Sequence, residues 1–151
     1  MKHDGRREFS VVVAAAKSSR GIGRGGQLPW TVRADMQYFK QLTRSTAEPT
    51  KRNAVVMGRK TWQSIPTKFR PLADRLNVVV SGNENAREEF EIPDSVLLVS
   101  SFDEALTTLC APEHADDIEH VYVIGGGSIY AEAIKLPDLC RRVFLTEIGN
   151  A

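Results

Sequence analysis

The stretch HVYVIGGGSIYAEAIK, residues 120–135, joins an apolar run to a helical pattern through three consecutive glycines. The run 120–124 is short and rich in β-branched residues, which predicts a buried strand, and the pattern of 128–135 predicts a helix. Glycines at such a junction let the backbone approach a bound group closely, and a helix start offers free N–H groups to an anion. The stretch predicts a strand-to-helix unit whose turn binds a phosphate or is simply tight.

The same organisation recurs along the chain. Helical patterns cover 33–43 and 102–110, with a short turn near 60–65, and Ser101 and Glu104 form a capping box. Strands alternating with helices predict an α/β fold with a mostly parallel sheet covered on both faces and a ligand crevice at the carboxyl ends of the strands. The polar, proline-containing segment 65–75 is expected to be a surface loop. Further β-branched runs predict strands at 11–16, 53–57, 76–80, 96–99 and 142–148.

Composition limits the function classes. With 151 residues, 42% hydrophobic and 26% charged, the chain is expected to be a single soluble domain. A formal net charge of +1 gives no footprint for nucleic acid or an anionic membrane, so the expected partner is a small molecule. No signal peptide or membrane span is recognisable, which predicts a cytoplasmic protein. Cys110 and Cys140 have neither metal nor redox spacing, and no metal site is predicted.

The segment RGIGRGGQLPW, residues 20–30, contains G-x-G-x-x-G after an apolar run. A dinucleotide-binding fingerprint would need a helix beginning on its last glycine and an acid about 20 residues later. Gly26 is instead followed by Pro29, which favours extended geometry at Leu28, and Asp35 is too near to be that acid. We interpret the segment as a glycine-rich loop that ends on an aromatic residue.

Asp35 occupies an unusual place for a carboxylate. On a helix over 33–43 it shares the apolar stripe with Phe39 and Leu42. It is either a first-turn acid favoured by the helix dipole, or a buried carboxylate with a raised pKa that binds a heterocycle with adjacent N–H donors. The sequence pattern leaves both readings open.

A second phosphate-friendly turn lies in VVMGRKTW, residues 55–62. A glycine, two cations and a threonine follow a predicted strand there, at a predicted helix start, which suits a phosphate. Two such turns after separate strands favour a dinucleotide that spans the sheet edge. Zinc-ligand spacing, a serine nucleophile elbow and a Walker-type phosphate loop are all lacking from the sequence.

Six blocks of this sequence, in this order, resemble the dihydrofolate reductase family over about residues 9–149. The resemblance implies that the glycine-rich segment is a lid loop that closes over the nicotinamide and excludes water. It also implies a dihydrofolate-reductase-like domain over 9–151, with 1–8 as a flexible N-terminal extension. The blocks are GIGxxGxLPW at 21–30, ADMQYFK at 34–40, VVMGRKTWQSIP at 55–66, RPLADRLNVV at 70–79, VIGGGSIY at 123–130 and FLTEI at 144–148.

The resemblance assigns catalytic and substrate-binding residues. Asp35 would bind the pteridine ring, Thr146 would hydrogen-bond that carboxylate, and Trp30 would orient a water beside it. Arg75 would pair with the α-carboxylate of the substrate's glutamate tail, a bidentate arrangement that suits arginine. The apolar substrate pocket would be lined by Val13, Ala14, Ile22, Met36, Phe39, Ile65, Leu72 and Ile124.

The resemblance also assigns the cofactor site to NADPH. The basic pair Arg59 and Lys60 would select NADPH over NADH through the extra phosphate, and a cis peptide is expected between Gly125 and Gly126. The remaining cofactor residues would be Ala15, Ile22, Gly23, Gly58, Thr61, Ser81, Gly127, Ser128 and Tyr130.

The implied reaction is hydride transfer from NADPH to C6 of 7,8-dihydrofolate with protonation at N5, which gives tetrahydrofolate for one-carbon and thymidylate metabolism and makes the protein an antifolate target. The family continues beyond the strand matching 142–148 into a last antiparallel hairpin, whereas this sequence stops at Ala151. We therefore expect a C-terminally truncated domain, or a piece of a longer polypeptide such as a fusion with thymidylate synthase. Two alternatives are a related pterin or flavin-precursor reductase and a non-catalytic ligand-binding fragment.

Overall fold

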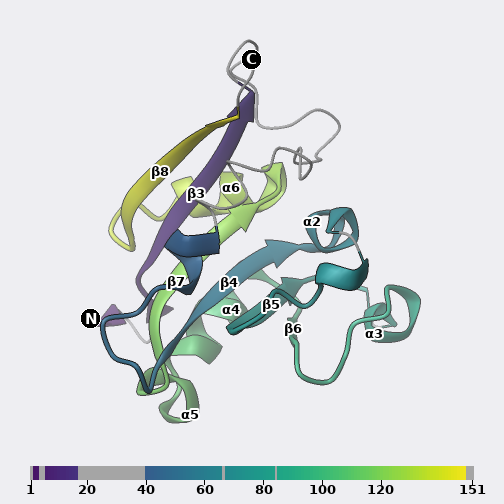
Figure 1. The fold of residues 1–151 in the computed structure, drawn as a ribbon, viewed down its shortest axis with the longest axis horizontal. Helices are drawn as coiled ribbons and strands as arrows, with labels where there is room; N and C mark the ends of the chain where they lie inside the picture. The colour runs from purple at the N-terminus through teal and green to yellow at the C-terminus, as the bar shows by residue number, and fades with distance from the viewer. Residues whose placement is uncertain (1, 4–5, 17–39, 66, 84, 149–151) are drawn as a thin grey trace.

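The computed structural model describes residues 2–3, 6–16, 40–65, 67–83 and 85–148. Its centre is a six-stranded sheet in the order β6-β5-β4-β7-β3-β8, in which every neighbouring pair is parallel (Figure 1). The strands are β3 (Phe9–Ala16), β4 (Arg52–Gly58), β5 (Arg75–Val80), β6 (Leu97–Val99), β7 (Ile118–Gly125) and β8 (Cys140–Ile148). The predicted α/β class and all six predicted strands are confirmed.

The connections between these strands contain the helices of the described residues. Residues 40–44 are helical, which places the end of the predicted helix 33–43 inside the described part. The remaining helices are α2 (Arg59–Ser64), η2 (Thr67–Phe69), α3 (Ala86–Glu89), α4 (Phe102–Cys110), α5 (Pro112–Ala115) and α6 (Gly127–Ile134). The predictions near 60–65, at 102–110 and at 128–135 are confirmed, whereas η2, α3 and α5 are additional single turns.

The two faces of the sheet bury different core clusters because side chains alternate along each strand. In β4, Val56 belongs to the cluster that also contains Leu106 of α4 and Ile129 of α6. Its neighbour Val55 points to the other face and joins a cluster with Trp62 of α2. Strands buried on both faces explain the continuous apolar runs in the sequence.

Of the two hydrogen bonds of the predicted capping box at α4, one is present. The Ser101 hydroxyl accepts a hydrogen bond from the Glu104 N–H at 3.0 Å. The Glu104 carboxylate, however, accepts from the N–H and the hydroxyl of Ser100, both at 2.7 Å, rather than from the Ser101 N–H. Two donors on one neighbouring residue outcompete the single expected one, and they lower the pKa of Glu104.

The prediction of a surface loop too polar for the core is wrong for part of segment 65–75. Ile65 and Leu72 are 2% and 6% exposed, and Arg75 is 7% exposed. The side chain of Asn77 makes this burial possible. Its Oδ1 accepts from the Leu72 N–H at 2.8 Å, and its Nδ2 donates to the Leu72 carbonyl at 3.0 Å, so the buried backbone is satisfied.

The N-terminal residues contact the domain within the described part. β1 (Lys2–His3) pairs antiparallel with β2 (Arg6–Arg7). The Arg7 guanidinium donates to the carbonyls of Leu109 at 3.3 Å and of Glu119 at 3.2 Å, and burial lowers the pKa of Arg7. These bonds tie β2 to the end of α4 and the start of β7.

Candidate functional site

A cavity of about 450 Å³ opens where β4 and β5 end and α6 begins. This is the carboxyl edge of the parallel sheet, where the sequence predicts a ligand crevice. Val80, Gly82 and Ile129, which the sequence analysis did not assign, contribute to its lining. The predicted cofactor residues that line it are Gly58, Arg59, Lys60, Ser81, Gly126, Gly127 and Ser128.

The backbone at this edge needs glycine at two positions. A Cβ on Gly58 would approach Ile129 Cγ1 to 3.2 Å, so glycine lets the end of β4 and the start of α6 come together. Gly125 has φ +119°, and a Cβ there would lie 3.0 Å from the Tyr130 hydroxyl. The predicted cis peptide between Gly125 and Gly126 is present.

Thr61 carries a polar atom that lacks a described partner. Its Oγ1 is buried and makes no hydrogen bond within the part of the chain that the structure describes, although the residue is only 1% exposed. A buried hydroxyl without a partner costs free energy, which a ligand that supplied the missing bond would recover. Thr61 is not itself part of the cavity lining, but it directly follows Arg59 and Lys60, which are. Neither α2 nor α6 has a side-chain N-cap, so neither helix start has its N–H groups bound by a capping side chain.

The two cationic side chains before Thr61, those of Arg59 and Lys60, differ in how far other side chains restrain them. The Arg59 guanidinium lies 5.0 Å from the centre of the Phe90 ring, and its Nη1 donates to Gln63 Oε1 at 2.9 Å. Lys60 is exposed. One cation is therefore fixed at the rim of the cavity and the other extends into solvent, an arrangement suited to the phosphates of a dinucleotide.

Tyr130 faces the interior of the domain. Its hydroxyl lies 2.7 Å from the Val12 carbonyl and 2.9 Å from the Ile124 carbonyl, and burial raises its pKa. It thereby links α6 to β3 and β7. The prediction that Tyr130 also contacts the cofactor stays a prediction.

The predicted substrate residues divide between the two faces of the sheet. Ile65, Leu72 and Ile124 share one core cluster. Val13, near the end of β3, packs against the other cluster. The structure thus brings three of these apolar side chains together on the face that carries α2.

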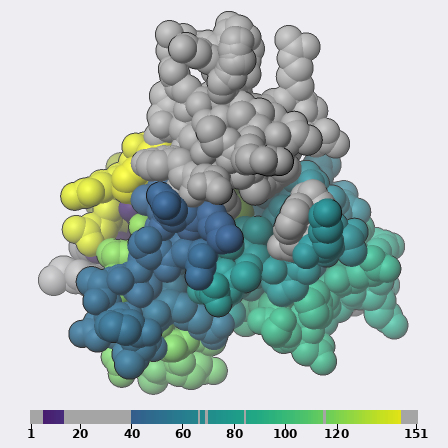
Figure 2. All heavy atoms as spheres, in the orientation of Figure 1, coloured from purple at the N-terminus to yellow at the C-terminus, as the bar shows by residue number. Residues whose placement is uncertain are grey.

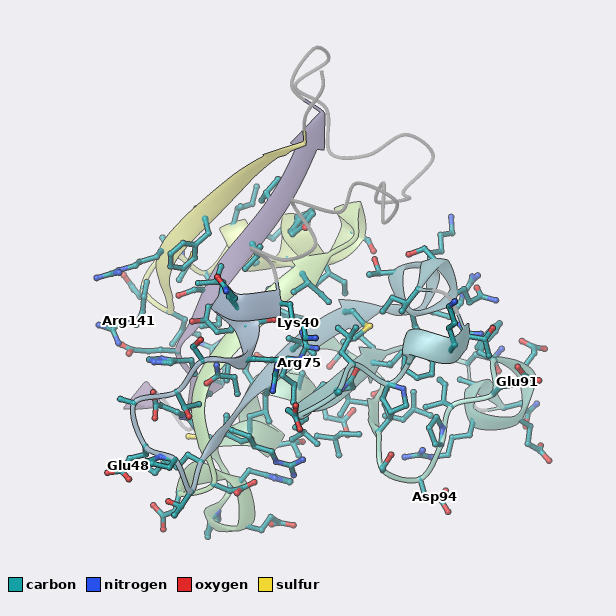
Figure 3. All side chains as sticks on the ribbon, in the orientation of Figure 1. Lys40, Glu48, Arg75, Glu91, Asp94 and Arg141 are labelled. Carbon is teal, nitrogen blue, oxygen red and sulfur yellow. The ribbon has the colours of Figure 1, made fainter. Side chains whose placement is uncertain are left out.

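Arg75 begins β5 and points its guanidinium at the end of the helical segment 40–44 (Figure 3). Its Nη1 donates to Thr43 Oγ1 and its Nε to the Ala73 carbonyl, each at 2.8 Å. Burial, and then the nearby Arg44, lower the pKa of Arg75 to about 10, so the group stays charged at neutral pH. Described residues bond only Nε and Nη1 of this fork, which leaves donors for an anion.

Arg75 and the cavity lie at opposite ends of one strand. β5 runs from Arg75 to Val80, and a strand rises about 3.3 Å per residue, so the two ends are roughly 17 Å apart. A ligand pair that reaches both ends would lie along the face that buries Ile65 and Leu72.

Several predicted residues lie outside the described part or are described only by their backbone. Thr146 of β8 lies opposite Ala14 of β3 in the strand register, and Glu147 lies opposite Ala15. The predictions for Ile22, Gly23, Trp30, Asp35, Met36 and Phe39 fall outside the described residues.

Sequence reasoning missed Thr43 and Asn77, which hold Arg75 and the turn before it. Both are buried, at 0% and 2% exposed. The available signal was a lone polar residue inside an apolar run, Asn77 in LNVVV, because a buried amide needs partners and often organises a neighbouring loop.

In the described part of the chain, helices of the length and apolarity needed to cross a membrane are absent.

The chain is similar to known dihydrofolate reductases. The family model described as dihydrofolate reductase matches residues 8–151. Dihydrofolate reductase of Heliothis virescens is 44% identical over 140 residues, which cover 93% of this chain and 73% of the relative. The structure of Schistosoma mansoni dihydrofolate reductase superimposes with a TM-score of 0.79 at 35% identity, covering 97% of this chain and 81% of that one.

Bifunctional relatives match as well. The bifunctional dihydrofolate reductase-thymidylate synthase 2 of Arabidopsis thaliana is 50% identical over 145 residues, 95% of this chain and 25% of the relative. The chain spans about a quarter of the length of the bifunctional plant relatives it matches. The family match over residues 8–151 and the identity to the Heliothis virescens enzyme establish that this chain belongs to the dihydrofolate reductase family.

Proposed function

We propose that the protein catalyses the NADPH-dependent reduction of 7,8-dihydrofolate to 5,6,7,8-tetrahydrofolate. The observation that carries the proposal is the cavity at the carboxyl edge, whose glycine turns and fixed Arg59 suit a dinucleotide. The buried Thr61 hydroxyl, which has no partner among the described residues, follows this lining along the chain. The family match supports the same activity.

NADPH, when bound, supplies the hydride, and the protein supplies orientation and electrostatics. Thr61 Oγ1 and the N–H groups of the turns before α2 and α6 would hold the pyrophosphate. Arg59 and Lys60 would favour NADPH over NADH by pairing with its additional phosphate. Ser81 and Ser128 would add hydroxyl contacts along the lining.

The substrate would lie on the apolar face between the cavity and Arg75. Arg75 would bind the α-carboxylate of the glutamate tail through its free donors. The pterin would be bound by Asp35, with Thr146 and Trp30 acting on that carboxylate and its water, as the family resemblance implies. Asp35 makes protonation of N5 easier by holding the ring in the productive orientation.

The main competing function is reduction of a pterin or flavin precursor that lacks a glutamate tail. Buried Arg75 favours dihydrofolate, because a charged fork kept from water is costly unless a ligand or partner uses it. Initial rates of NADPH oxidation with dihydrofolate and with 6-methyl-7,8-dihydropterin distinguish the two. We expect the higher kcat/KM with dihydrofolate, whereas equal values would favour the tail-less substrate class.

The names of the plant relatives support a fusion to thymidylate synthase in the full-length protein. A cytoplasmic location also stays a prediction from the sequence.

A further inference from the structure

Arg75, the proposed carboxylate-binding residue, is held by Thr43, and Thr43 is in turn held by Asn53, which lies opposite Arg75 on the neighbouring strand β4. Thr43 Oγ1 accepts from Arg75 Nη1 at 2.8 Å, and Thr43 is fully buried. Thr43 belongs to the helical residues 40–44, which end one residue after it. The position of its hydroxyl therefore depends on what fixes this helix end.

Asn53 at the start of β4 fixes it. Its Nδ2 donates to the carbonyls of Thr43 at 3.0 Å and Ser45 at 2.9 Å, and its Oδ1 accepts from the His120 N–H at 3.0 Å. Asn53 is 0% exposed. Both amide hydrogens and the carbonyl oxygen are thus used, which orients the amide uniquely and ties the helix end to β7. In Figure 1 the segment from residue 40 to β4, in blue, passes in front of β7.

A second restraint acts on Ala47 and Glu48, a few residues after Thr43. Glu119 of β7 accepts from the N–H groups of Ala47 at 2.7 Å and Glu48 at 2.9 Å. These bonds hold the exposed part of the connection, seen in blue on the lower left of Figure 2. The Thr43 carbonyl itself accepts from Asn53 Nδ2.

We propose that Asn53 is a positioning residue for substrate binding: through Thr43 it sets the guanidinium of Arg75 for the carboxylate of the glutamate tail. This inference rests on the proposed function, and it concerns a residue that never touches the substrate. If the helix end moved, the Thr43 hydroxyl would move with it and shift the Nη1 side of the Arg75 guanidinium. Bidentate binding of a carboxylate tolerates little displacement of the guanidinium. The pterin end of the substrate, bound elsewhere, would be unaffected.

The test compares Asn53→Ala with wild type on dihydrofolate and on 6-methyl-7,8-dihydropterin. We expect the KM for dihydrofolate to rise about 5–10-fold with kcat within about twofold, while kcat/KM for the dihydropterin stays within about twofold. In an Arg75→Lys background, Asn53→Ala should raise the KM for dihydrofolate by less than a further factor of about two, since the effects of coupled residues are not additive. Asn53→Ser, which keeps one hydroxyl donor, should give an intermediate KM and is measured in the same way if the alanine variant does not fold.

Leu109→Ala is the matched control. Leu109 belongs to the core cluster that packs under α4, so its truncation destabilises the fold without removing a contact of Asn53, Thr43 or Arg75. Leu109→Ala should lower the melting temperature and leave KM and kcat unchanged for both substrates. Parallel losses on both substrates in the Asn53 variants, or full additivity with Arg75→Lys, would overturn the inference. A wild-type protein that does not reduce dihydrofolate would instead refute the proposed function, so the two failures are distinguishable.

Discussion

At the scale of single residues, the site contains two polar groups whose surroundings are unusual. The Thr61 hydroxyl is buried without a partner among the described residues, one residue after Lys60 of the cavity lining. Arg75 is buried with only part of its fork bonded. Both conditions lower the stability of the ligand-free protein and become favourable once a ligand supplies the missing bonds.

Replacing Thr61 by valine should therefore have opposite effects on folding and binding. We expect Thr61→Val to leave the melting temperature unchanged or slightly higher, since it removes an unsatisfied hydroxyl of nearly the same shape. Its affinity for NADPH should fall about tenfold, the equivalent of a net hydrogen bond of about 1–1.5 kcal/mol. NADPH titration followed by tryptophan fluorescence measures the affinity.

Thr107→Val is the control for that experiment, because the Thr107 hydroxyl donates to the Asp103 carbonyl on α4, away from the cavity. It should not change NADPH affinity. A lower melting temperature with unchanged affinity in Thr61→Val would mean that the Thr61 hydroxyl serves the fold instead.

Replacing Arg75 by lysine should weaken recognition of the substrate tail. A hydrogen bond to a charged group contributes about 1.5–3 kcal/mol, so the KM for dihydrofolate should rise about 10–100-fold in Arg75→Lys. Steady-state kinetics on dihydrofolate and 6-methyl-7,8-dihydropterin measures this, with Arg44→Lys as the control because Arg44 pairs with Asp74 at 2.7 Å on the surface. Equal losses on both substrates in Arg75→Lys would contradict a role in tail binding.

At the scale of secondary-structure elements, the connection between the helical residues 40–44 and β4 is held by the carboxylate of Glu119. The N–H of Ala47, then that of Glu48, lower the pKa of Glu119 below its ordinary value of 4.5. A carboxylate with a lowered pKa in the folded protein stabilises it above its unfolded pKa and loses that effect as the pH falls through the folded value.

Glu119→Gln should accordingly lower the melting temperature at pH 7, and the difference from wild type should shrink as the pH falls below 4.5 and through the lowered pKa of Glu119. Thermal melts of both proteins across this range measure it. Glu113→Gln, on the first turn of α5, is a control that should change little at any pH. A difference independent of pH would contradict the assignment to the ionised carboxylate.

The elements also show what the sequence could predict. The six strands were recognisable because each contains a short apolar, β-branched run, and the inner strand β4, with NAVVM, is buried on both faces. α3 and α5 were missed because single turns of four residues carry too little periodicity. The burial of Leu72 was missed because it depends on Asn77, a tertiary partner that composition does not reveal.

At the scale of the whole molecule, the glycine turns were predicted from local pattern, whereas the proposed ligands and the proposed role of Arg75 come from the family resemblance. The contacts of Arg75 with Thr43, 32 residues away in the sequence, could not be read from local pattern. The structure shows how these parts are arranged, because the cavity lies at one end of β5 and Arg75 lies at the other.

A ligand that binds only the folded protein must stabilise it as a whole. At a concentration of 1,000 Kd the gain is about 4 kcal/mol, so NADPH with a tight antifolate should raise the melting temperature by about 8–16 °C. Differential scanning fluorimetry with NADPH, NADH and the antifolate measures the shifts, and NADH should give the smaller one. A melting temperature unmoved by either nucleotide would contradict the assignment of the cavity.

The most direct test of the account follows NADPH absorbance after dihydrofolate is added to the purified protein, with and without a tight antifolate. We expect oxidation that requires dihydrofolate, is stopped by the antifolate, and is sharply reduced near neutral pH in Asp35→Asn while NADPH affinity is retained. Binding of NADPH and the antifolate without any oxidation would contradict it and leave a ligand-binding protein on a dihydrofolate reductase fold.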